Sequence, residues 1–145
     1  MTRIRADRPT MIATALALVG IAIAAYLTWV HYEGISPVCT TGGCERVQAS
    51  TYAEIGPIPV ALLGLIGYVL IFASLFVGGE IGRALTFMLT LAGFAFSLYL
   101  TYLELFVIDA ICQWCVASAV VMTLLLVTAT VRLLRLAAPD QPAPG

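Results

Sequence analysis

The sequence predicts an all-α integral membrane protein, a bundle of four transmembrane helices with a loop and a short helix covering its outer side. Hydrophobic residues make up 61% of the 145 residues and charged residues only 10%, whereas a soluble domain carries about 25% charged residues. Four apolar segments also reach the ~20 residues that a helix needs to cross a bilayer. The length favours a single membrane domain over residues 1–145.

The four apolar segments cover residues 11–30, 58–77, 84–107 and 110–134. Lipid offers no hydrogen-bond partners, so helices, which satisfy their own backbone groups, are favoured over strands. The polar loop 31–57 contains Thr51-Tyr52-Ala53-Glu54, a capping box that predicts a short helix ending at Gly56-Pro57. The Pro-rich tail 137–145 is expected to be disordered.

A secretory signal peptide is the alternative interpretation of the first segment. Three arginines give it a basic start, and Ala22-Ile23-Ala24 resembles a cleavage site. The apolar stretch continues beyond that point, however, and Tyr26 and Trp29 suit an anchor at the membrane interface. We therefore expect a retained membrane helix.

The arginines predict the orientation of the chain. If both termini are cytoplasmic, six of the seven arginines lie on the cytoplasmic side and only Arg46 lies outside, which agrees with the positive-inside rule. The loop 31–57 and the short connection 108–110 then lie outside. Both cysteine pairs fall on this outer side, which is the oxidising side in a bacterium or in an organelle lumen. No basic run interleaved with aromatic residues indicates nucleic-acid binding.

Four cysteines in two close pairs are the candidate functional residues. Cys112 and Cys115 form a CxxC motif at the start of the fourth apolar segment, where positions i and i+3 share a helix face. Asp109 is the expected N-cap, which would place Cys112 in the first turn, where the helix dipole favours a thiolate. Cys39 and Cys44 are separated by four residues, two of them glycine, and can form a disulfide. The pattern favours thiol–disulfide exchange.

Two structural interpretations of the cysteines compete with redox exchange. A zinc site is one, although zinc sites more often repeat CxxC or add histidines, and His31 is the only histidine. We therefore expect no metal. A non-catalytic membrane scaffold stapled by two static disulfides is the other. Glu104 has two interpretations: it is an acid with a function inside the membrane, or an acid that reaches the membrane interface.

The order of these parts resembles the vitamin K epoxide reductase family, in its bacterial branch. A cysteine pair follows the first helix, Ser50 lies six residues after Cys44, and Gly56-Pro57-Ile58-Pro59 opens the second helix. The strings 59–64 (PVALLG) and 111–115 (ICQWC) also look like that branch. The DsbB type of thiol oxidase, by contrast, has its CxxC first.

The resemblance implies a quinone-dependent thiol–disulfide oxidoreductase. Cys39 would exchange with a separate thioredoxin-like (DsbA-type) protein, and Cys44 would pass the disulfide to or from Cys112. Cys115 would contact a quinone, menaquinone or ubiquinone, held among the helices. Ser50 would help to position the loop. All four cysteines and Ser50 are therefore the candidate catalytic residues.

Reduction of a quinone or of vitamin K epoxide is the alternative activity within this family. Members that reduce the epoxide have a tyrosine one turn after the second CxxC cysteine, where this chain has Ala119. They also have an asparagine before the second helix, in the region of Gly56 here. These departures favour disulfide formation. Some bacterial members carry a fused thioredoxin domain, whereas this chain stops at Gly145, so a separate partner is expected.

Overall fold

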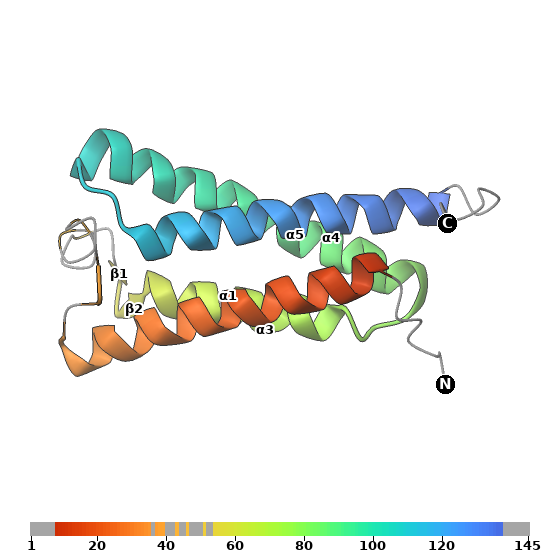
Figure 1. The fold of residues 1–145 in the computed structure, drawn as a ribbon, viewed down its shortest axis with the longest axis horizontal. Coiled ribbons are helices and arrows are strands. Elements are labelled where there is room, and N and C mark those ends of the chain that lie inside the picture. Colours follow the sequence, from red (N-terminus) through yellow and green to blue (C-terminus); the bar gives the residue numbers. More distant parts are fainter. Residues whose placement is uncertain are drawn as a thin grey trace.

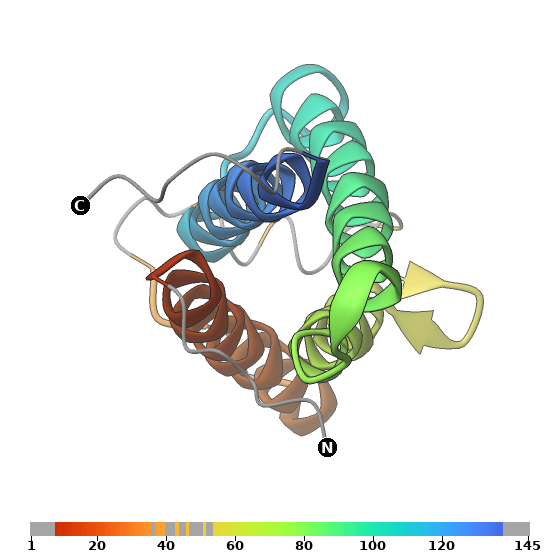
Figure 2. The ribbon, with the colours of Figure 1, turned by 90° about the vertical axis from the view of Figure 1, so that its right-hand side faces the viewer.

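The computed structural model describes residues 8–35, 37–39, 43, 46, 51 and 54–137. Its helices are α1 (Arg8–Glu33), α3 (Val60–Ser74), α4 (Gly79–Tyr102) and α5 (Gln113–Ala137), followed along the bundle in Figure 1. The other elements are the strands β1 (Glu54–Ile55) and β2 (Ile58–Pro59) and the π-helical segment η2 (Leu103–Ile108). Viewed along the bundle, the four α-helices surround a common centre (Figure 2).

Three helices in the described part of the chain are long and apolar enough to cross a membrane. They are Arg8–Glu33, Gly79–Ile108 and Gln113–Arg135. The apolar helix α3 has only 15 residues, which at 1.5 Å per residue is shorter than the ~30 Å hydrocarbon core. Many large apolar side chains are exposed on the helices, for example Leu18, Val69, Leu98 and Val127. A lipid environment accounts for these exposed side chains, so the chain is a membrane protein.

The second helix is shorter than the expected segment 58–77, because α3 begins at Val60 and ends at Ser74. A residue before proline avoids the helical conformation, and Ile58 precedes Pro59, so this residue is extended in β2. The fourth helix likewise begins later than expected, at Gln113 rather than residue 110.

A β-hairpin occupies the place where the capping box predicted the end of a short helix. Glu54 pairs with Pro59 and Ile55 with Ile58 in antiparallel register. Gly56 opens the two-residue turn with φ +62°, the position at which type II′ hairpin turns require glycine. The prediction of a helix through Glu54 is therefore wrong, because glycine and proline together favour a tight turn. Tyr52 and Ala53 lie outside the described residues.

Small residues and internal hydrogen bonds hold the helices together. Gly20 of α1 lies against the ring of Tyr68 and leaves no room for a larger side chain. The Tyr68 hydroxyl lies 2.8 Å from both the carbonyl oxygen and the hydroxyl of Ser118, which joins α3 to α5. Near the other end of the bundle, the buried hydroxyls of Ser74 and Thr86 lie 2.7 Å apart and join α3 to α4. Close contacts at small residues and buried hydroxyl pairs are typical of packing in membranes.

Candidate functional site

The start of α5, which Cys112 directly precedes, lies at the end of the bundle opposite the start of α1 and the end of α5 (Figure 1). Cys39 and Cys115 pack against the cluster that Ala110 and Cys112 form. Cys39 is in a disulfide, whereas Cys112 and Cys115 are free thiols, the first fully buried and the second half-buried. Cys44 and Ser50 lie outside the described residues.

The loop that carries the first pair also touches the segment before the CxxC. Gly43, which precedes Cys44 in the sequence, lies directly against the backbone of Ile111, with no space for a Cβ atom. Ile111 is the neighbour of Cys112. The structure therefore brings a residue adjacent to each pair into backbone contact, and glycine is the residue that permits this approach.

Cys112, and not Asp109, occupies the N-cap position of α5. Asp109 has left-handed backbone angles (φ 54°, ψ 37°) and ends the π-helical segment η2. The carbonyl of Cys112 accepts the N–H of Val116 at 3.0 Å, which is the first hydrogen bond of the α5 ladder. The expected N-cap at Asp109 is therefore wrong, because the chain has to leave the π-helical turn before α5 can begin. The backbone N–H groups of Trp114 and Cys115, in the first turn of the helix, hydrogen-bond to Cys112.

This position favours the thiolate form of Cys112. Hydrogen bonding by the Cys115 thiol, and then by the backbone N–H groups of Cys115 and Trp114, lowers the pKa of Cys112 to about 7. Burial and the charge of Glu104 act in the opposite direction without cancelling this effect. A thiol with a pKa near 7 is a good nucleophile for disulfide exchange at neutral pH.

Replacing Cys115 by alanine or by serine should separate its hydrogen bond from the other causes of the lowered pKa of Cys112. In protein with a reduced CxxC, we expect one thiolate to form near pH 7, with the protonated thiol below this pH and the thiolate above it. Cys115→Ala removes the main hydrogen bond and should raise the pKa of Cys112 by at least one unit. Cys115→Ser retains a hydroxyl that can donate this hydrogen bond, so it should change the pKa of Cys112 less. Ultraviolet absorbance of the thiolate measures the titration. A wild-type midpoint at the ordinary thiol value of about 8.5 would contradict this assignment.

Val38, the residue before Cys39, is held by three hydrogen bonds. Its N–H donates to the Tyr26 hydroxyl at 3.0 Å. Its carbonyl accepts the indole N–H of Trp114 at 2.6 Å and the amide N–H of Gln113 at 3.4 Å. The two middle residues of the CxxC motif therefore fix the loop that carries the other pair. The aromatic rings of Tyr26 and Trp114 also pack together, with their centroids 5.0 Å apart. We call the contacts of these two residues with the Val38 backbone the clamp.

Trp114→Phe should loosen the clamp without removing the aromatic ring. The lost hydrogen bond contributes about 0.5–1.5 kcal/mol net, so we expect the Val38 amide to exchange with solvent deuterium about 2- to 10-fold faster. Trp29→Phe is the matched control, since Trp29 is the other tryptophan of the chain and is exposed. Equal exchange rates in the two variants would show that the indole N–H does not hold the loop.

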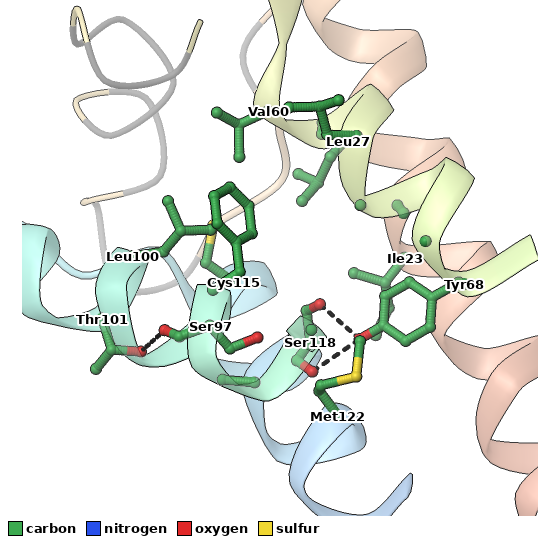
Figure 3. Close-up of a pocket in the computed structure, with 18 of the residues that line it drawn as sticks. Ile23, Leu27, Val60, Tyr68, Ser97, Leu100, Thr101, Cys115, Ser118 and Met122 are labelled. Carbon is green, nitrogen blue, oxygen red and sulfur yellow. Dashed lines mark hydrogen bonds between the residues drawn. The ribbon is translucent and has the colours of Figure 1, made fainter. Parts of the chain in front are cut away.

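An apolar cavity of about 170 Å³ lies between the helices, next to the CxxC motif. All four α-helices and η2 line it, through side chains that include Leu27, Val60, Leu100, Cys115 and Met122 (Figure 3). The hydroxyls of Tyr68 and Ser118 hydrogen-bond to each other, and Thr101 donates to the Ser97 carbonyl. These hydrogen bonds lie within the protein, so the wall offered to a ligand is mainly apolar, with the Cys115 thiol and the Glu104 carboxyl group as its reactive polar groups.

Glu104 lies beside both cysteines, buried at 5% exposure. Its carboxylate oxygen Oε2 accepts the backbone N–H of Cys112 at 3.3 Å, and the carboxyl group interacts with the Cys115 thiol. His31 Nε2 and Glu54 Oε1 lie 3.0 Å apart, and this pair does not include Glu104. Glu104 thus lies beside the CxxC motif, on the wall of the cavity.

Sequence reasoning missed the clamp and the cavity wall. Phe96 of α4, for example, lines the cavity. Nothing in the spacing of Tyr26 and Val38 signals that they meet Trp114. In the part of the chain that the structure describes, no group of three or more His, Cys, Asp or Glu residues could hold a metal ion.

The fold and the site together define a helical membrane protein with a free CxxC motif on the wall of an apolar cavity. The model of the vitamin K epoxide reductase family matches residues 11–130 of the chain. This match covers most of the sequence, so the chain belongs to the vitamin K epoxide reductase family. It is a membrane oxidoreductase of a family whose chemistry involves quinones.

Proposed function

We propose that the protein is a quinone-dependent thiol–disulfide oxidoreductase that promotes disulfide formation. Electrons pass from a separate thioredoxin-like (DsbA-type) protein through its cysteines to a membrane quinone. The observation that carries this proposal is the position of Cys115. Its thiol lines the apolar cavity, while Cys39 of the loop packs against the cluster of Ala110 and Cys112. The CxxC pair thus connects the loop with the cavity.

A quinone headgroup, menaquinone or ubiquinone, fits the chemistry of this cavity. The lining is predominantly apolar with few polar groups, as in sites for flat, apolar ligands. When bound, the quinone would accept two electrons and two protons and leave as the quinol. Leu27, Val60, Leu100 and Met122 would hold its ring, and Cys115 would face it.

The reaction consists of two disulfide exchanges and one oxidation. In the first exchange, the Cys39–Cys44 disulfide takes two electrons and two protons from the partner's dithiol, and the partner gains a disulfide. In the second, the Cys39/Cys44 dithiol reduces a Cys112–Cys115 disulfide. The CxxC dithiol then forms its own S–S bond again and delivers two electrons and two protons to the quinone. Ser50 would hold the loop near this pair.

We assign the protein to the bacterial cell membrane with four spans, α3 being the fourth. Four crossings leave both termini cytoplasmic and the cysteines outside. This arrangement is supported by the bundle, in which α1 begins and α5 ends at one end and α5, with its CxxC motif, begins at the other (Figure 1). Cys39 packs against the cluster that Ala110 and Cys112 form there. It also puts Arg83, Arg132 and Arg135 on the cytoplasmic side and Arg46 outside.

Coupled turnover of the purified protein tests the function. Reduced DsbA-type protein and quinone are mixed with it in detergent or vesicles, and quinol is measured together with the partner's disulfide. We expect the two products in equal amounts. A scaffold with static disulfides would form neither, and its disulfides would resist mild reductant. A quinone epoxide in place of the quinone should give no turnover, because Ala119, on the cavity wall, occupies the position at which the epoxide-reducing members have a tyrosine.

A further inference from the structure

Glu104 is an acid buried at the loop end of the bundle, beside the two CxxC cysteines. It is 5% exposed and belongs to the π-helical segment Leu103–Ile108. Burying a carboxylate without a cationic partner is unfavourable, and intramembrane acids usually face a functional cavity. Single π-helical turns within helices are also frequent at functional sites.

Glu104 borders two separate hollows of the structure. The first is the central cavity, where it shares the wall with Cys115. The second is a more open hollow at the loop end of the bundle, which Gly43, Arg46 and Asp109 also line. Among the residues described, Glu104 is the one that lines both hollows. Its carboxyl group therefore lies between the cavity and the outer face.

Oxidation of the CxxC pair requires a group that handles protons at this point. A buried thiol has to lose its proton as its sulfur forms the S–S bond, and water has little access to an apolar cavity. Among the described residues that line the cavity, Glu104 is the one with a carboxyl group. The other polar side chains of the cavity wall are hydroxyls, such as those of Tyr68 and Ser118, which ionise far above neutral pH or not at all.

We propose that Glu104 is the proton carrier between Cys115 and the bound quinone, an inference that rests on the proposed function. Its carboxylate takes the proton of the Cys115 thiol as the Cys112–Cys115 bond forms. The electron pair released passes to the quinone. The carboxyl group then returns its proton to a quinone oxygen in the same cavity. The second proton, from Cys112, reaches the quinone through the same carboxyl group. Two protons and two electrons thus leave the dithiol and appear in the quinol.

Glu104→Gln tests this role, because glutamine keeps the size and still accepts the N–H of Cys112. In the full-length protein, we expect quinol formation to fall by on the order of 100-fold, the usual effect of losing a general base. Reduction of the protein's disulfides by the DsbA-type dithiol, measured without quinone, should stay within about threefold of wild type, since the loop cysteines are intact. Asp109→Asn is the matched acid-to-amide control in the outer hollow alone, and asparagine tolerates its left-handed backbone.

Chemical rescue distinguishes proton transfer from a structural role. Glu104→Ala leaves space beside the outer hollow, so formate should restore quinol formation in proportion to its concentration, whereas chloride should not. If Glu104→Gln does not fold, formate rescue of Glu104→Ala decides by itself whether Glu104 carries protons. Wild-type quinol formation in Glu104→Gln, or no rescue of a folded but slow Glu104→Ala, overturns the role of Glu104. Absence of quinol formation in the wild-type protein itself overturns the proposed function and this inference with it.

Discussion

Cys115→Ala is expected to abolish quinone reduction while leaving thiol exchange with the partner intact. Cys115 is the thiol that lines the cavity, whereas the fully buried Cys112 packs towards Cys39. Without Cys115, no S–S bond can form within the CxxC motif. Loss of a residue that reacts directly lowers turnover on the order of 10³-fold or more. Stopped-flow measurement of quinol formation with reduced DsbA-type protein gives the rate.

The same variant provides its own control, because Cys39 and Cys44 are unchanged. One round of disulfide transfer from the protein to the reduced partner should proceed at the wild-type rate. Cys115→Ser should behave as Cys115→Ala does in turnover, although it preserves the hydrogen bond to Cys112. Substantial quinol formation in either variant would exclude Cys115 as the residue that reduces the quinone.

Gly64→Leu is expected to block the quinone site without harming the fold. Gly64 of α3 lines the cavity, and a Cβ atom added there meets no other atom within 4 Å. A leucine side chain would therefore extend into the cavity and occupy much of its volume of about 170 Å³. Glycine in a helix interior is less favourable than leucine by roughly 1 kcal/mol, so the helix should gain stability. We expect quinol formation to fall at least tenfold.

Ile66→Trp on the same helix is the matched control for added bulk. Ile66 is exposed on the outside of the bundle, so a larger side chain there should leave quinol formation unchanged. Thermal unfolding in detergent should show Gly64→Leu to be at least as stable as the wild-type protein. Normal turnover by Gly64→Leu would mean that the quinone reacts somewhere other than this cavity.

The sequence predicts the helical membrane class well, because that prediction rests on properties averaged over many residues. An apolar stretch such as the one around Leu16 or Leu125 has few alternatives to a helix in lipid. Helix ends depend on single residues and were predicted less well. Pro59 shortened α3 at its start, and the left-handed Asp109 delayed the start of α5.

The candidate site was predictable only as far as its residues are neighbours in the sequence. The spacing of Cys112 and Cys115 predicts a pair on one helix face, which is a local property. The contact of Gly43 with Ile111 and the bonds from Val38 to Tyr26 and Trp114 join distant segments. Such contacts depend on how the helices pack, and no local pattern encodes them. The same holds for the cavity, which exists only where all four α-helices meet.

The most direct test of whether the CxxC pair reduces the quinone is a single turnover by a protein that retains only this cysteine pair. The double variant Cys39→Ala/Cys44→Ala is reduced, freed of reductant and mixed with quinone, and quinol is then counted together with the thiols that remain. We expect one quinol per chain, with both CxxC thiols converted into a Cys112–Cys115 disulfide. Two thiols that persist beside unreacted quinone would contradict this expectation.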